Sequence, residues 1–231
     1  MSDSQWQLHY EGLDPKKEGL REALCTLGNG VFATRGAAEE QHAGAISYPG
    51  TYVGGVYNQL ASEVAGHTVV NEDLVNVPNW LWLTFRPVDG DWLDLWQANL
   101  LAYSQTLDLR DGILTRDFRV RDGKGRITRV TSRRLVHMGN PNLAALSWEM
   151  IAENWSGEAV VRTGIDGSVT NNGVPRYRQL SAKHLEIEER SHGAASPELG
   201  PETERRIDCE NGEHRDGFVW ITEDPSEHGC R

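Results

Sequence analysis

Two adjacent acidic pairs, Glu39-Glu40 and Glu72-Asp73, are the side chains with the clearest capacity for acid–base chemistry. Cleaving a glycosidic bond requires two carboxyl groups that face each other across the bond, with one of them protonated near neutral pH. Neighbouring residues of an extended chain point to opposite faces, so neither pair offers this arrangement. We therefore expect neither pair to be catalytic, and we interpret both as solvated or salt-bridged loop residues.

Asn79 and Trp80 form the stretch best suited to touch a sugar. An indole face packs on the apolar face of a pyranose while an amide hydrogen-bonds two hydroxyl groups, a mixture typical of small-ligand sites. The alternative is that Trp80 anchors the core or an interface between domains. Tyr52 and Arg35 join the candidates, although Tyr52 can simply fill the core and Arg35 can pair with Glu39-Glu40. These four residues are our candidate carbohydrate-binding residues.

The sequence shows no motif for a metal or a cofactor. Its eight histidines are scattered, without the HxH or HExxH spacing of metal ligands. Gly28, Gly30 and Gly36 do not form the dinucleotide-binding motif GxGxxG, because Ala33 stands in the third glycine position. We therefore predict no metal and no cofactor.

Composition limits the partners and the compartment. A net charge of -11 argues against nucleic acid and anionic membranes, which both attract a basic face. Cys25, Cys209 and Cys230 are odd in number and lack CxxC spacing, so we expect free thiols, with Cys25 buried. The first residues lack the basic and apolar regions of a signal peptide, and no apolar run is long enough to cross a bilayer. We therefore expect a cytoplasmic protein.

The elements that must position the candidate residues are mostly strands. Regular spacing of short strands with few helices is typical of a β-sandwich or barrel. We expect an edge strand at Trp6 to Tyr10, a short helix within Lys16 to Leu24, and an inner strand, apolar on both faces, at Trp80 to Phe85. We also expect strands at Tyr52 to Tyr57, at Trp92 to Leu95, around Leu114, Phe118 and Val120, at Arg126 to Val136, at Ala144 to Ala152 and at Glu158 to Ile165, with a hairpin turn at Asp122 to Gly125.

The pattern changes after Ile187. Residues 186–231 hold 13 Asp and Glu against 5 Arg, and so carry most of the negative charge. Glu188 to Glu213 is polar, and only Phe218 to Ile221 resembles a strand. We expect one domain over residues 1–231, with a well-patterned sandwich over 1–187 and an acidic, poorly patterned segment over 188–231. Divergence, truncation or an altered reading frame would each explain that segment.

Four motif blocks carry the most specific signal. The first contains Gly28-Asn29-Gly30, a tight turn, because Gly and Asn tolerate the left-handed backbone region. The blocks are LGNG…RG…EE within Leu27 to Glu40, GTYVGGVY from Gly50 to Tyr57, LVNVPNW from Leu74 to Trp80, and LDLRDGILTR from Leu107 to Arg116. In this order they resemble the N-terminal domain of glycoside hydrolase family 65, which comprises maltose, trehalose and kojibiose phosphorylases and related trehalose hydrolases.

The resemblance implies a mainly β fold, an antiparallel β-sandwich of the galactose-mutarotase-like super-sandwich type with one or two short helices. It implies that catalysis belongs to an (α/α)6 barrel that follows the sandwich and is absent from this chain, so no catalytic residue is carried over. The implied partners are that barrel and an α-glucoside disaccharide. A homodimer is a further expectation, and nucleic acid and membrane are excluded.

Three functions follow from these patterns. The first is a non-catalytic sandwich that supports the barrel and dimerisation, which predicts an apolar patch left exposed when the barrel is absent. The second is a free-standing module that binds α-glucosides through Trp80, which measurable sugar affinity would favour. The third is an enzyme of the sugar-mutarotase type, although no His/Glu pair in the sequence can be assigned as its acid and base.

Overall fold

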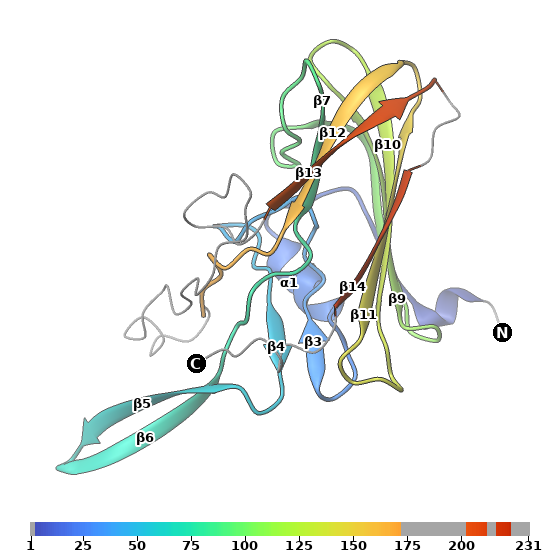
Figure 1. The fold of residues 1–231 in the computed structure, drawn as a ribbon. Helices are drawn as coiled ribbons and strands as arrows, with labels where there is room; N and C mark the ends of the chain where they lie inside the picture. The colour runs from blue at the N-terminus through green and yellow to red at the C-terminus, as the bar shows by residue number, and fades with distance from the viewer. Residues whose placement is uncertain (1–2, 172–201, 212–215, 223–231) are drawn as a thin grey trace.

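Two packed antiparallel sheets form the body of the computed structural model, which describes residues 3–171, 202–211 and 216–222 (Figure 1). The larger sheet has the strand order β1-β8-β9-β10-β11-β14. Its strands are β1 (Gln7–Glu11), β8 (Asn99–Asp108), β9 (Ile113–Arg121), β10 (Ile127–Val136), β11 (Ala144–Ala152) and β14 (Asp216–Thr222). All neighbouring strands run antiparallel, and successive hairpins build the centre of the sheet.

A smaller sheet faces the larger one, in the order β13-β12-β7. A third sheet and a short helix lie beneath it in Figure 1. The smaller sheet is formed by β7 (Leu83–Pro87), β12 (Gly157–Gly164) and β13 (Glu202–Cys209). The third sheet contains β2 (Leu27–Gly28), β3 (Phe32–Thr34) and β4 (Thr51–Val53), and the helices are α1 (Glu18–Leu24) and the 3-10 helix η1 (Asp3–Trp6). The predicted β-sandwich with one or two short helices is confirmed.

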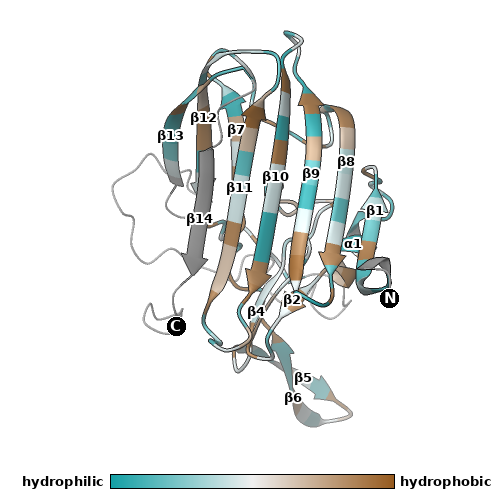
Figure 2. Cartoon of the chain, turned by 90° about the vertical axis from the view of Figure 1, so that its right-hand side faces the viewer, coloured by the Kyte–Doolittle hydropathy of each residue, from teal (hydrophilic) through white to brown (hydrophobic). Residues whose placement is uncertain are grey.

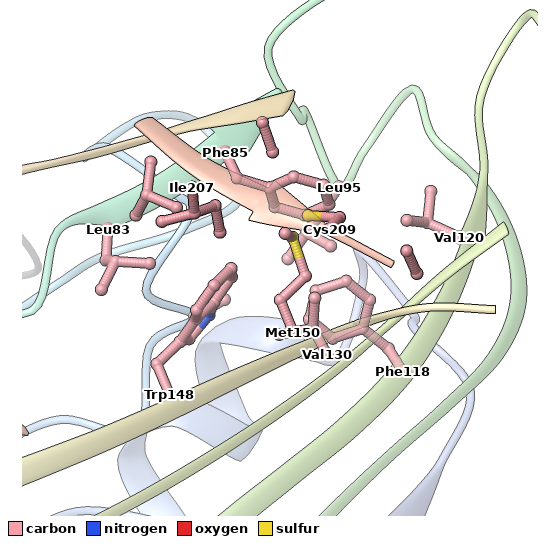
Figure 3. Packing of buried hydrophobic residues seen from close by; sticks show 14 of the residues in the cluster. Leu83, Phe85, Leu95, Phe118, Val120, Val130, Trp148, Met150, Ile207 and Cys209 are labelled. Atoms are coloured by element: carbon pink, nitrogen blue, oxygen red, sulfur yellow. The ribbon is translucent and has the colours of Figure 1, made fainter. Parts of the chain in front are cut away.

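Side chains from facing strands interlock between the two sheets (Figure 3). Alternate residues of β9, β10 and β11 are buried, so every second side chain points to the core. The rings of Phe85 on β7 and Trp148 on β11 lie 5.7 Å apart and join the layers. Burying a large apolar side chain stabilises a fold by about 1.5–3 kcal/mol. Others of this core are Leu83, Leu95, Phe118, Val120, Val130, Met150, Ile207 and Cys209.

Most predicted strands are present. The edge strand is β1, the helix is α1, and the four strands predicted between Leu114 and Ile165 are β9, β10, β11 and β12. The hairpin turn at Asp122 to Gly125 forms because Asp122 Oδ1 accepts the N–H groups of Lys124 and Arg126, while Gly125 adopts a φ of 83°. Phe218 to Ile221 falls within β14.

Two predicted strands are wrong. Tyr52 to Tyr57 is interrupted at Gly54-Gly55, because Gly55 adopts a φ of 93° that turns the chain out of the sheet. Trp92 to Leu95 is not a strand. The N–H of Leu93 donates to the carbonyl of Phe85 and Asp94 caps a following turn, so this segment covers the edge of β7.

Two further strand interpretations need correction. The predicted inner strand Trp80 to Phe85 begins as a strand only at Leu83 and lies at the end of its sheet. Consecutive residues Leu83, Thr84 and Phe85 are nevertheless all buried, so both faces of this strand are covered as predicted. The polar stretch after Glu188 contains β13, which the sequence pattern did not predict. Its strand alternates charged residues with the buried Ile207 and Cys209, a weak apolar signal.

A long hairpin, which we call the arm, projects from the body (Figures 1 and 2). It consists of β5 (Tyr57–Val64) and β6 (His67–Leu74), which pair along their whole length through a two-residue turn at Ala65-Gly66. Both turn residues have positive φ, as a tight hairpin requires. No sequence pattern predicted this hairpin.

Candidate functional site

The acidic pair Glu39-Glu40 lies inside the sandwich, on the inner face of the larger sheet. Arg116 occupies an inward position of β9, where its Nη1 donates to Glu39 and its Nη2 donates to Glu40 Oε2 at 2.8 Å. The side chain of Arg116 is only 1% exposed. Ser132 Oγ donates to Glu39 at 3.1 Å, and the indole N–H of Trp148 donates to Glu40 at 3.5 Å. Both carboxylates are therefore held by partners from the fold itself.

Arg134 and the backbone around Glu39 extend this network to both sheets. Arg134 Nη2 donates to the carbonyl of Ala37 at 2.7 Å, and its Nη1 lies 3.7 Å from Glu39 Oε1. On the opposite sheet, the N–H of Leu83 donates to the Glu39 carbonyl at 3.0 Å. We call Glu39, Glu40, Arg116 and Arg134 the ionic cluster. For this pair the solvated interpretation is wrong and the salt-bridged alternative is correct, because buried arginines require buried partners.

Burial shifts the titration of the ionic cluster. It raises the pKa of the Glu40 carboxyl to about 7, and it lowers the pKa of Arg116 to about 9 and that of Arg134 to about 10. In each case the low-dielectric interior disfavours the charged form. Glu18 on α1 behaves alike, since burial and then the negative charge of Glu22 raise its pKa to about 7. These shifts come from packing inside the fold.

Arg35 and Tyr52, two of the candidate sugar-binding residues, meet at Gly50. A Cβ added at Gly50 would lie 2.6 Å from Arg35 Cδ and 2.9 Å from Tyr52 Oη. Arg35 Nε donates to the Tyr48 carbonyl at 2.9 Å, and its Nη2 lies 3.4 Å from Glu22 Oε2. The expected pairing of Arg35 with the acidic pair is wrong, because the ionic cluster already occupies that pair. Arg35 instead joins α1 to the loop before β4.

Asn79 and Trp80, the other two candidates, lie in a second local network. The backbone of Asn79 forms two hydrogen bonds with Asp166, and its Oδ1 accepts the N–H of Leu81 at 3.0 Å. Trp80 packs, half-buried, on a satellite of the core, with its ring 6.2 Å from that of Phe32. Among the described residues, Asn79 Nδ2 and Trp80 Nε1 are buried without a hydrogen-bond partner. This position agrees with an anchoring role for Trp80, and sugar contact stays a prediction.

A histidine–aspartate pair lies beside Asn79 and was not predicted from the sequence. His42 Nδ1 lies 2.8 Å from Asp166 Oδ2, and the His42 ring packs 4.7 Å from the ring of Trp82. Burial opposes the charge on Asp166, but hydrogen bonds from His42 and Ser168 outweigh it and lower the pKa of the carboxyl. The two residues are 124 positions apart, so no local motif could have revealed the pair. An isolated histidine–aspartate pair of this kind connects the two loops, and a histidine in such a pair can also accept or donate a proton.

The remaining motif residues also serve the backbone. Asn29 Oδ1 accepts the N–H groups of Val31 and Phe32, which closes the turn between β2 and β3. Gly36 leaves no room for a side chain, because a Cβ there would lie 2.5 Å from Cys25 Cβ. Asn76 accepts the N–H of Thr51 at 2.9 Å and donates to Pro49 and Thr170. All four motif blocks thus contain residues that fix the fold.

The described parts of the chain offer no group of three or more His, Cys, Asp or Glu residues that could hold a metal ion. Within the same residues, no helix has the length and apolar character needed to span a membrane. Cys25 is a buried free thiol, which confirms the expectation for this residue, and Cys209 is also buried.

Fold and packing together define an all-β sandwich domain whose interior holds a self-paired ionic cluster. Comparison with known proteins then places it. The model of the glycosyl hydrolase family 65 N-terminal domain matches residues 8–208. The chain belongs to this family, and the resemblance drawn from the four motif blocks is confirmed.

Relatives of known sequence are much longer than this chain. An uncharacterised glycosyl hydrolase from Mycobacterium tuberculosis is 51% identical over 183 residues, which cover 79% of this chain and 14% of that protein. A trehalose 6-phosphate phosphorylase from Lactococcus lactis is 35% identical, with 84% of this chain and 25% of the relative covered. A kojibiose phosphorylase from Caldanaerobacter subterraneus is 32% identical, with 81% and 23% covered. The chain thus spans a quarter or less of these relatives.

A solved structure confirms the fold. A chain described as a kojibiose phosphorylase from the human microbiome superposes with a TM-score of 0.77 at 16% sequence identity. The match covers 94% of this chain and 32% of the other. At this identity the likeness concerns architecture alone.

Proposed function

We propose that this chain is the non-catalytic N-terminal β-sandwich of a family 65 disaccharide phosphorylase or hydrolase. In this role it supports a catalytic (α/α)6 barrel that lies elsewhere in the protein and cleaves an α-glucoside. The observation that carries the proposal is the ionic cluster: the one acidic pair of the family motifs that faces the interior, Glu39-Glu40, is neutralised by Arg116. Carboxylates bound in this way hold the two sheets together instead of cleaving sugar.

The arm supplies the surface on which the barrel would rest. Cross-strand pairing places Tyr57 beside Leu74 and Ala61 beside Val70, and side chains two residues apart share a face. The hydrogen-bonded pair Gln59–Glu72 lies between them on the same face. Tyr57 is 53% exposed, Val70 is 55% exposed and Leu74 is 38% exposed. We call Tyr57, Ala61, Val70 and Leu74 the arm face. A two-stranded hairpin is marginally stable alone in water, so a partner is needed to cover it.

The relatives' length supports the barrel as that partner, because three quarters or more of each lies outside the matched region. The buried free thiol of Cys25 supports a reducing, cytoplasmic setting. The mutarotase-type alternative gains no support, because the buried carboxylates Glu39 and Glu40 are bound by Arg116.

The test is complementation. The purified chain should neither phosphorolyse nor hydrolyse maltose, trehalose or kojibiose. The catalytic portion of the Lactococcus relative, expressed without its own N-terminal domain, should gain solubility and activity when this chain is added. Val70→Asp on the arm face should abolish that gain, since it buries a charge in the contact.

Val69→Asp is the matched control, because Val69 is 42% exposed but lies on the opposite face of the same strand. It should leave complementation nearly unchanged. Turnover by the isolated chain would refute the non-catalytic role. Self-association through the arm, with no binding to the catalytic portion, would assign the arm face to a homodimer instead.

A further inference from the structure

A cleft of about 730 Å³ is lined in part by the β9–β10 turn. This turn lies at the end of the sandwich away from the arm (Figure 2). One wall is the segment between β7 and β8, from Asp89 to Ala98, and the other is the turn from Asp122 to Arg126. Phe85, Val120 and Thr128 are its most buried lining residues. Its volume lies within the range of small-ligand sites, about 300–1,000 Å³. None of the candidate carbohydrate-binding residues lines this cleft.

Ion pairs fix the two walls relative to each other. Asp89 on one wall forms ion pairs with Lys124 and Arg126 on the other wall, and its Oδ1 lies 2.5 Å from Arg126 Nη1. Arg126 Nε also binds Asp122 at 2.6 Å, and its guanidinium stacks 5.5 Å from the ring of Trp155. The cleft is therefore formed before any ligand arrives, which reduces the ordering cost of binding.

Polar groups remain available at the mouth. Within the described part of the chain, the side chains of Asp91, Asn99 and Arg121 take part in no hydrogen bond or ion pair. Asp94 is different, because it accepts the N–H of Trp96 at 2.9 Å and the amide of Gln97 at 2.8 Å. That bond orients the Gln97 amide. A carboxylate, two amides and a guanidinium thus lie around one opening.

The charge balance selects the ligand class. Four aspartates line the cleft against one lysine and two arginines, so a phosphorylated ligand would meet net repulsion. The described residues hold no metal-binding group there. A neutral ligand with many hydroxyl groups matches a lining that combines donors and acceptors with the buried apolar residues Phe85 and Val120. We infer that this cleft is a saccharide-binding site, separate from Trp80.

The site stands independently of the supporting role proposed above. The domain would still bind carbohydrate, but at the end of the sandwich opposite the arm and not at Trp80. Failure of barrel complementation would leave this site untouched, and failure to bind sugar would leave the supporting role untouched.

The experiment is a titration of the isotopically labelled chain with maltose and, separately, with trehalose. Binding is monitored through the amide and indole NMR signals of the chain. The side-chain amides of Asn99 and Gln97 and the indole of Trp92 should shift with sugar concentration. The indole of Trp80 should not. Asp91→Ala combined with Asn99→Ala should weaken binding about tenfold, as expected for the loss of two exposed hydrogen bonds.

Glu63→Ala, an exposed carboxylate on the arm, is the matched control and should bind like the parent chain. The cleft substitutions remove side chains without partners, so their thermal unfolding midpoints should match the parent and exclude misfolding. Absence of any shift at tens of millimolar sugar would overturn the inference. Shifts centred on Trp80, with the cleft signals unchanged, would overturn it equally.

Discussion

Acidic residues in the ionic cluster and on the arm have opposite surroundings and therefore different effects. Glu39-Glu40 is enclosed between two sheets and depends on Arg116. Glu72, from the other acidic pair, is exposed on β6 and accepts the amide of Gln59 at 2.7 Å, whereas its neighbour Asp73 is buried. In the cluster, loss of one partner leaves a charge in a low-dielectric interior. At Glu72, water replaces the lost partner, so this charge affects recognition more than stability.

The largest effect that would test this contrast is loss of the central arginine. Arg116→Met should destabilise the chain by about 3–5 kcal/mol, because Glu39 and Glu40 would be left buried without their cation. Urea unfolding followed by tryptophan fluorescence measures it. Arg129→Met is the control, since Arg129 pairs with Asp117 at the surface and should cost about 1 kcal/mol or less. Equal losses of unfolding free energy in the two variants would mean that the buried cluster stabilises the fold no more than a surface ion pair does.

Buried Glu18 gives a second, pH-dependent effect. Its pKa is about 7 in the fold against 4.5 for an unperturbed glutamate, so between these values the folded state binds more protons than the unfolded one. Stability therefore falls as pH rises through that window, by on the order of 3 kcal/mol for this group. Glu18→Gln removes the proton exchange. The free energy of unfolding of the variant, relative to that of the parent, should therefore be higher at pH 8 than at pH 5, as measured by urea unfolding at both values. The same difference in free energy at both pH values would contradict the prediction.

The smallest effect is expected on the arm. Val70→Asp should change the free energy of unfolding by about 0.5 kcal/mol or less, because an exposed side chain of an isolated hairpin contributes little to the body. The same urea series measures it, with Val69→Asp alongside. A loss comparable to that of Arg116→Met would show that the arm packs on the body in solution.

Much of the body could be predicted from the sequence. The alternation from Ala144 to Ala152 identifies β11 and its buried face, and Asp122 to Gly125 identifies a hairpin turn, because both signals are local. The arm was missed because its strands bury little and so lack a clear alternation. β13 was missed for a related reason: its register depends on β12, to which Glu202–Cys209 is paired.

The candidate site was predicted only in part. Tyr52 and Arg35 do come together, at Gly50, but the partner of Arg35 is Glu22 and not the acidic pair. The cleft walls are brought together by Asp89 and Arg126, which stand 37 positions apart. No spacing rule covers such pairs.

By itself, the sequence determined the β class, the central hairpins and the family, because apolar periodicity, turn residues and ordered motifs act over short distances along the chain. Only the tertiary structure decided that Glu39-Glu40 is buried, that His42 meets Asp166, and that a cleft opens far from Trp80. Those outcomes depend on which distant side chain supplies the compensating charge or hydrogen bond. In a packed interior that partner sets the free energy of every polar group.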